Sequence, residues 1–141
     1  MSGVTVDASV WVAAAELSDS YCAQSRAFLA AVVRRGVRVS APAFARLEVA
    51  CALARRRRDA AMARRLTDSA LAPNRVVQAP VDSSLLGRAL LAGTSSFLRG
   101  ADALYAVTAQ LDGSQLVSWD NELIQRGGAI TPTDWLAASP D

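Results

Sequence analysis

The feature that most constrains the fold is the alternation of short β-rich runs with longer helical patterns. The β-rich runs are 4–6, 37–40, 75–78 and 115–119, and a pair of helical patterns separates each run from the next. One more helix and a short last strand before Thr131 follow. This order predicts a three-layer α/β/α sandwich around a mostly parallel central sheet. With right-handed crossovers and a sheet order that switches at the first strand, the first and fourth strands become neighbours.

Two of these runs end on a carboxylate. Asp7 follows the first run and precedes a helix for which Ser9 is a suitable N-cap, and Asp120 closes the run 115–119. Ligands of open α/β sheets bind at the carboxyl edge of the strands, so we expect Asp7 and Asp120 to lie together there. Either acid could instead serve only as a turn or helix cap.

Two further acids stand in helical patterns. Glu48 lies on or beside the apolar face of a helix over about 42–57, and a buried acid there is costly unless it is paired or binds a cation. An ion pair with Arg55 is the alternative for Glu48. Asp102 falls in the first turn of an apolar helix that continues to Leu111, where capping alone could explain it.

The residue types that the sequence lacks limit the catalytic mechanisms that it can use. The chain has no His and no Lys, and all fifteen basic residues are Arg. These absences exclude Ser-His-Asp and Cys-His catalysis, HExxH zinc sites, P-loops and Schiff-base enzymes. Carboxylate chemistry remains. Four acids in one pocket repel one another unless a cation binds, and Mg²⁺ or Mn²⁺ suits a site built only from oxygen ligands.

Length and composition indicate one globular domain over 1–141. The hydrophobic fraction is 52%, which is typical of a chain with a packed core. No apolar run is long enough to span a bilayer and no charged leader precedes an apolar segment, so neither a membrane span nor a signal peptide is expected. Cys22 and Cys51 are expected to be small buried residues, which favours a cytoplasmic location.

At this point the residues resemble a known family. Four segments, in this order and at these spacings, are similar to motifs of the PIN-domain nucleases: Asp7-Ala8-Ser9 after the first strand, the helical Glu48, Asp102-Ala103-Leu104-Tyr105, and Ser118-Trp119-Asp120. The resemblance covers nearly the whole chain. The length looks most like that of the VapC-type ribonuclease toxins of bacterial toxin–antitoxin pairs.

This resemblance implies both the activity and its residues. It implies a Mg²⁺- or Mn²⁺-dependent endoribonuclease that forms a homodimer and is blocked by a VapB-like antitoxin. The implied catalytic and metal-binding residues are Asp7, Glu48, Asp102 and Asp120. Contacts to these acids or to the substrate are implied for Ser9, Ser118 and Asn121. The alternative is a non-cleaving PIN-fold module that binds RNA or protein, and a second rival is an enzyme acting on another phosphate ester such as a DNA flap.

The charge distribution suggests where RNA would bind. Residues 26–75 carry twelve Arg against three acids, a balance of +9, and the remainder carries three Arg against ten acids, a balance of −7. An acidic site needs a basic rim to attract a polyanion, and Arg pairs well with phosphate. The candidates for holding the RNA backbone are Arg55, Arg56, Arg57, Arg58, Arg64 and Arg65. An acidic stretch of antitoxin, or solvent alone, could also face this cluster.

The helices within 42–71 form a candidate protein-binding face. They are rich in Ala, which permits close helix approach, and Phe44, Leu47 and Leu66 are larger apolar anchors. Either a second copy of the chain or the antitoxin could bind there. The alternative is that these side chains belong to the internal core.

Overall fold

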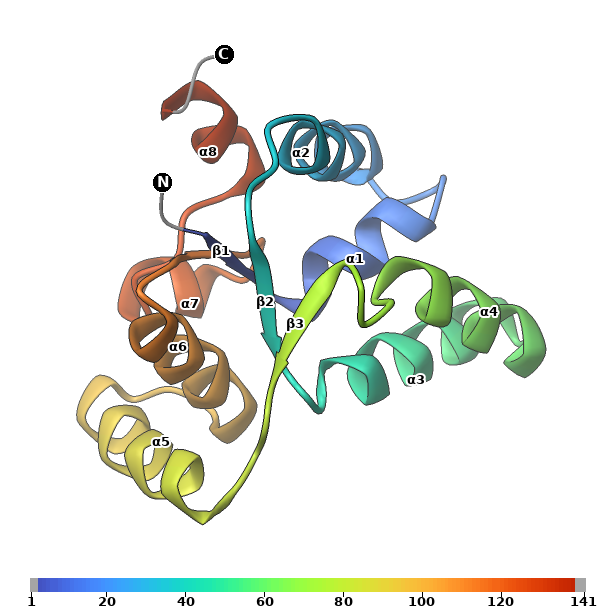
Figure 1. The fold of residues 1–141 in the computed structure, drawn as a ribbon. Coiled ribbons are helices and arrows are strands. Elements are labelled where there is room, and N and C mark those ends of the chain that lie inside the picture. The colour runs from blue at the N-terminus through green and yellow to red at the C-terminus, as the bar shows by residue number, and fades with distance from the viewer. Residues whose placement is uncertain (1–2, 139–141) are drawn as a thin grey trace.

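The computed structural model describes residues 3–138, and at its centre is one sheet of four parallel strands (Figure 1). The strands are β1 (Val4–Val6), β2 (Val39–Pro42), β3 (Val76–Ala79) and β4 (Gln115–Val117), in the order β3–β2–β1–β4. β1 and β2 are buried throughout, as expected of strands covered on both faces. β1 pairs in parallel with both β2 and β4, so the predicted parallel sheet and the predicted neighbourhood of first and fourth strands are confirmed.

Helices on both sides of the sheet complete the three predicted layers (Figure 1). On one side α6 (Gly100–Asp112) packs against β1, β2 and β4, and α5 (Ser83–Ser96) packs against α6. A connected group on the other side contains α1 (Ala8–Ala15), α2 (Cys22–Arg34), α3 (Ala45–Arg57) and α4 (Ala60–Ala70). α7 (Asn121–Arg126) follows β4, and α8 (Pro132–Ala138) packs against α2.

The main core joins strand valines to large side chains of the helices. Val6 and Val117 are completely buried, and Phe28 of α2 and Tyr105 of α6 are at most 1% exposed. Burying one such side chain stabilises the fold by roughly 1.5–3 kcal/mol. Trp135 of α8 meets Phe28 edge-to-face at 5.2 Å between ring centroids, which ties the end of the chain to this core. No helix among residues 3–138 has the length and apolarity needed to cross a membrane.

The composition of residues 93–96, Gly-Thr-Ser-Ser, predicts a loop, and the structure corrects this prediction. This segment is the last turn of α5, which ends where Phe97 adopts the left-handed conformation with φ 58°. A Cβ added at Gly93 would lie 2.8 Å from the Cβ of Ala103 in α6. Gly93 therefore marks a close approach between two helices, and the interpretation of it as a helix break was wrong.

Other boundaries also differ from the expected ones. The second strand is 39–42 and not 37–40, and Pro42 pairs with Ala79 at its end while the Ala43 N–H supplies the hydrogen bond to the Ala79 carbonyl. The expected last strand is reduced to Ile130, which pairs singly with Val117. Cys22 is buried as expected, but Cys51 is exposed.

Candidate functional site

The ends of β1 and β4 bring Asp7 and Asp120 to one edge of the sheet. Val6 is in register with Val117, and the Asp7 N–H donates to the Val117 carbonyl at 3.1 Å. Each acid is also the N-cap of the helix that follows its strand, because its carboxylate accepts from backbone N–H groups of α1 or α7. The prediction that Ser9 is the N-cap of this helix was wrong, because Asp7 is the N-cap of α1. Asp7 and Asp120 therefore each cap a helix and also lie at the same edge of the sheet.

Two serine hydroxyls link these acids. The hydroxyls of Ser9 and Ser118 donate to Asp7 Oδ2 at 2.7 and 2.8 Å. Ser118 Oγ also accepts from the Asp120 N–H at 2.9 Å, and Ser9 Oγ accepts from the Trp119 N–H at 3.1 Å. Three hydrogen bonds thus hold Asp7 through Oδ2, counting the one from the Ser9 N–H at 3.4 Å. Within residues 3–138 no hydrogen bond is made to Oδ1, so this oxygen is free to bind a ligand.

A second group of carboxylates surrounds Arg99. Asp102, in the first turn of α6, Asp120 and Glu122 each offer an oxygen within 4.8 Å of the others, close enough to hold one metal ion. The Arg99 guanidinium lies among them: Nε is 3.0 Å from Asp102 Oδ2 and 3.3 Å from Glu122 Oε2, and Nη2 is 2.7 Å from Asp120 Oδ2. An internal cation therefore balances these acids.

Glu48 lies in the first turn of α3 with one carboxylate oxygen sealed from solvent. Its Oε1 has no hydrogen-bond partner in the described part of the chain, and neither has the buried hydroxyl of Tyr105. Burial raises the pKa of Glu48; the Tyr105 hydroxyl opposes this, and the charges of Asp7 and Asp102 add to it. Residues 3–138 contain no ion pair for Glu48, so the alternative pairing with Arg55 was wrong. An unpartnered buried acid is costly, and a bound cation would remove that cost.

The four predicted acids interact electrostatically. Burial raises the pKa of Asp102, Arg99 opposes this rise, and the charges of Asp120 and Asp7 reinforce it. Burial, Asp7 and Glu48 together also raise the pKa of Tyr105. The donors are all carboxylate oxygens, a set that fits Mg²⁺ or Mn²⁺. Asp102, Asp120 and Glu122 offer oxygens close enough to hold such an ion, and Asp7 and Glu48 lie near enough for their charges to act on this group or on each other.

Sequence reasoning missed Glu122 and Arg99 as members of this site. The available signals were an acid in the first turn of α7 two residues after Asp120, and a base three residues before Asp102. Of the residues expected to contact the acids or substrate, Ser9 and Ser118 bond to Asp7 directly. Asn121 is exposed on the first turn of α7, and its side chain makes no hydrogen bond within residues 3–138.

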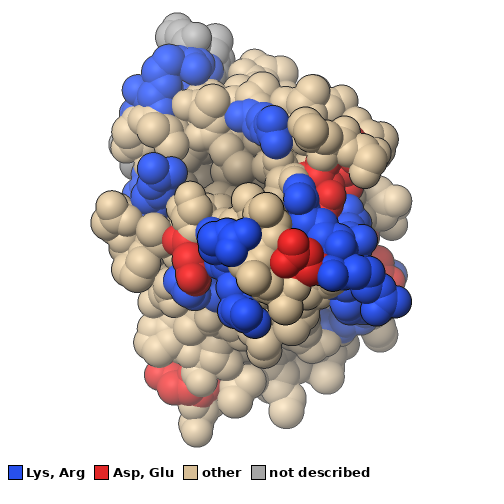
Figure 2. Space-filling model, turned by 90° about the vertical axis from the view of Figure 1, so that its right-hand side faces the viewer, with Lys and Arg blue, Asp and Glu red and all other residues tan. Residues whose placement is uncertain are grey.

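One member of the arginine cluster, Arg56, lines the same cavity as Glu48. Figure 2 shows one side of the molecule with its charged residues coloured. There arginine side chains gather in patches with carboxylates between them. All six candidate arginines are exposed. A hollow of about 480 Å³ is lined by Ala52, Arg55, Arg56 and Arg58. Arg57 instead donates to Glu16 at 3.1 Å and to the Ala15 carbonyl at 2.6 Å, which fastens α3 to the end of α1.

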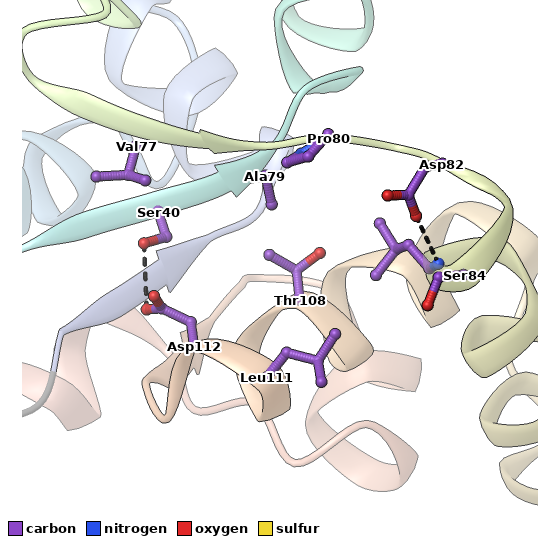
Figure 3. A pocket seen from close by; sticks show the side chains of 10 residues that line it. Ser40, Val77, Ala79, Pro80, Asp82, Ser84, Thr108, Leu111 and Asp112 are labelled. Atoms are coloured by element: carbon purple, nitrogen blue, oxygen red, sulfur yellow. Dashed lines mark hydrogen bonds between the residues drawn. The ribbon is translucent and has the colours of Figure 1, made fainter.

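Another cavity, of about 330 Å³, lies away from the four acids (Figure 3). It is bounded by residues of β2, β3, α5 and α6, and in it the Ser40 hydroxyl points to Asp112 and donates to Oδ2 at 3.1 Å. Burial raises the pKa of Asp112, but hydrogen bonds from Arg38, Ser114 and Ser40 outweigh burial and lower it. Ser40 and Asp112 are occupied in holding the end of α6, whereas the Thr108 hydroxyl has no partner among the described residues. None of the four predicted acids lines this cavity, so it is not the candidate site.

Comparisons with known proteins agree with this architecture. The PIN domain profile matches residues 4–129, whereas no curated protein matches the sequence significantly. The fold is similar to that of PAE2754 from Pyrobaculum aerophilum, with a TM-score of 0.72 and 25% identity, covering 97% of this chain and 88% of that one.

Two further structures share the fold. One is a toxin–antitoxin complex from Klebsiella pneumoniae, with a TM-score of 0.70 and 16% identity, covering 92% of this chain and 98% of that chain. The other is Mycobacterium tuberculosis VapC20, a sarcin–ricin loop cleaving toxin, with a TM-score of 0.71 and 19% identity, covering 90% of this chain and 97% of that chain. Since the profile spans most of the sequence and the four motif segments converge in one fold, this chain belongs to the PIN domain family.

Proposed function

We propose that this protein is a Mg²⁺- or Mn²⁺-dependent endoribonuclease, the VapC-type toxin of a toxin–antitoxin pair. One observation carries the proposal: in a PIN-family fold, Asp102, Asp120 and Glu122 offer oxygens within 4.8 Å of one another, and the charges of Asp7 and Glu48 act on Asp102 or on each other. The buried Glu48 oxygen without a partner in the described chain adds to it. The similar fold of a sarcin–ricin loop cleaving toxin favours RNA as the substrate, and the cytoplasm is then the expected compartment.

The residues of the chain would divide the work of hydrolysis. A bound divalent ion supplies charge neutralisation and lowers the pKa of water. Ser9 and Ser118 fix Asp7 through Oδ2 and leave Oδ1 for the ligand. Burial raises the pKa of both Glu48 and Asp102, and either carboxylate could accept a proton from the attacking water. The water oxygen then bonds to phosphorus as the ester P–O bond breaks.

A VapB-like antitoxin and a second copy of the chain are the proposed protein partners. Of the three expected anchors, Phe44 and Leu66 pack against the chain's own core, whereas Leu47 is 67% exposed. α3 therefore presents fewer apolar anchors than expected. α5 exposes Leu86, Leu90 and Leu91, which offers a second copy an apolar surface. Light scattering of wild type and Leu90→Glu would test this dimer, which the charge should weaken.

The activity is tested by RNA cleavage with Mg²⁺ or Mn²⁺ and with EDTA. Asp7→Asn and Asp102→Asn should each lower the rate more than about 100-fold, since even partners of metal ligands are worth 10- to 100-fold. An Asn at position 7 can still cap α1, and at position 102 it removes a charge that burial and neighbouring acids disfavour, so the fold should persist. Asp134→Asn, which changes an exposed acid at the start of α8, is the control and should keep full activity.

The alternatives give different results in the same assay. RNA binding without cleavage in either metal would favour a non-cleaving PIN-fold module. Equal cleavage of DNA competitors would indicate a broader phosphodiesterase. Full activity of either Asp→Asn variant would contradict the assignment of the acids.

A further inference from the structure

Two stacked aromatic rings lie beside the acids. Tyr21, the N-cap residue of α2, and Trp119, two residues after the end of β4, are parallel within 8° with 4.0 Å between ring centroids. The Trp119 indole N–H donates to Ser25 at 2.8 Å, and its backbone N–H donates to Ser9, the residue that bonds to Asp7. The stack is thus fixed to α2 and to the candidate site at once.

This stack lines a cavity that opens into the candidate site. The cavity measures about 290 Å³ and shares Ser9 and Glu48 with that site. Such a volume is near the lower end for small-ligand pockets, roughly 300 Å³. Its other lining residues are mostly small and apolar: Ala8, Val12, Ala13 and Ala52, with Asp19 and Arg56 as further polar groups. Trp119 covers one face of Tyr21, yet Tyr21 stays 45% exposed, so the ring has aromatic surface left for a ligand.

The cavity also adjoins the arginine-lined hollow. Ala52 and Arg56 line both. The Arg56 guanidinium is held 3.1 Å from Asp19 Oδ2, and Asp19 Oδ1 accepts from the Tyr21 N–H at 2.9 Å. A continuous path therefore runs from the arginines, past the aromatic stack, to the acids.

We propose that the cavity lined by Tyr21 and Trp119 binds an unpaired nucleobase of the RNA substrate. Aromatic side chains stack on any base, and Arg beside them binds the backbone phosphate. The carboxylates of Asp19 and Glu48 accept hydrogen bonds and repel phosphate, so the edge of a base with N–H donors fits this cavity and a phosphate does not. The substrate class is single-stranded RNA, a loop or an end, because a base in a duplex cannot enter.

This inference rests on the proposed ribonuclease activity but is tested by binding. Fluorescent single-stranded RNA is titrated in Ca²⁺ with wild type, Tyr21→Leu and Tyr21→Phe. Loss of the ring should weaken binding about tenfold, whereas Phe retains the stack and should bind like wild type. Phe97→Leu removes an aromatic ring that is 78% exposed outside the cavity, and it should have no effect. Thermal melting of each variant checks that it is folded.

A second measurement uses wild type alone. 2-Aminopurine is placed at successive positions of the RNA, and one position should lose fluorescence when its base stacks in the cavity. An abasic site at that position should weaken binding about as much as Tyr21→Leu does. Unchanged affinity of Tyr21→Leu together with no quenched position would overturn the proposal, as would duplex RNA binding as tightly as single strands.

Failure of each proposal leaves a distinct pattern. Tyr21-dependent binding without metal-dependent cleavage supports the base site and contradicts the nuclease. Normal cleavage by Tyr21→Leu with an unchanged KM contradicts the base site and leaves the nuclease standing.

Discussion

Arg99 occupies the position among the carboxylates that a divalent ion would need. It contacts Asp102, Asp120 and Glu122 at 2.7 to 3.3 Å, yet its own side chain is 65% exposed. An exposed guanidinium can swing into solvent at small cost, whereas the acids it leaves behind repel one another. Arg99 therefore supplies these acids with a counter-charge that a divalent ion could replace.

Replacing Arg99 should tighten divalent binding. In Arg99→Gln no internal cation competes, so we expect the affinity for Mn²⁺ to rise several-fold by calorimetry. Without metal the variant should melt at a lower temperature than wild type, and Mn²⁺ should raise its melting temperature more. Arg126→Gln is the matched control, because Arg126 pairs with Glu122 alone among these acids and only at the surface. Equal Mn²⁺ affinity in wild type and Arg99→Gln would refute the competition.

Glu48 should make the metal-free protein less stable as the pH rises. Burial raises the pKa of Glu48 above 4.5 in the folded state, so the unfolded state releases its proton first. The contribution of Glu48 to the free energy of unfolding is fully present below pH 4.5. It is lost as the pH rises through the pKa that Glu48 has in the folded state. Asp102, with a pKa raised from 3.8 by burial, contributes in the same direction.

Urea unfolding in EDTA from about pH 4 to about pH 8 would measure this loss. The free energy of unfolding of wild type should fall relative to that of Glu48→Gln across this range. Mn²⁺ should restore the stability of wild type at the upper end. A difference between the two proteins that does not change with pH would show that Glu48 is not destabilised by its charge.

At the level of secondary structure, the contact between α5 and α6 sets the position of Asp102. Gly93 of α5 faces Ala103, the residue next to Asp102 in the first turn of α6. Any side chain at position 93 would push this turn and move the acid. The close packing of α5 on α6 therefore helps to fix the position of Asp102 in the site.

Gly93→Ala should therefore destabilise the fold and reduce metal binding. The added methyl gains helix propensity but overpacks the contact, at a net cost of about 1–3 kcal/mol. Gly87→Ala on the same helix is the control, since nothing lies within 4 Å of its added Cβ. The control should stabilise by about 0.4–1 kcal/mol. Denaturant unfolding and Mn²⁺ titration of both variants would measure the effect, and two variants of equal stability would contradict it.

The elements that sequence reasoning predicted well are those with local signals. A strand that ends on Asp and turns into a helix is recognisable in a few residues, and the parallel order then brings Asp7 to Asp120. Contacts that depend on tertiary distance were missed: Arg99 reaches Asp120 across twenty-one positions. The composition of segment 93–96 favours a loop, but the segment is helical, and Gly93 is there because α6 packs too closely for a side chain. The pairing of Tyr21 with Trp119 likewise has no local signature.

Over the whole molecule, the basic and acidic parts of the sequence meet at one region of the surface. The arginine-lined hollow adjoins the cavity that contains Glu48, so the excess of +9 over residues 26–75 lies where it can attract a polyanion toward the acids. Of the six candidate arginines, Arg56 and Arg57 are ion-paired to Asp19 and Glu16. Within residues 3–138 the other four make no ion pair: Arg55, Arg58, Arg64 and Arg65.

Neutralising the hollow should weaken RNA binding regardless of sequence. For Arg55→Ala/Arg56→Ala, we expect the slope of log affinity against log salt to flatten by about 0.7 per lost phosphate contact. Titrations in Ca²⁺ at several salt concentrations would measure it. Arg88→Ala, on exposed α5, should leave the slope unchanged. An unaltered slope and affinity in the double variant would assign the cluster to solvent or to a protein partner.

The double role of Asp7 and Asp120 as site acids and helix caps has a genetic consequence. Most replacements at either position would abolish the acid and also weaken a helix. Under the proposed toxin function, cells that escape it by such a mutation should therefore carry a poorly folded, readily degraded protein. Asn keeps the cap and is one base change from Asp. Among spontaneous inactive alleles at these codons, Asn should therefore be the one that leaves an abundant, folded protein still able to sequester its partners.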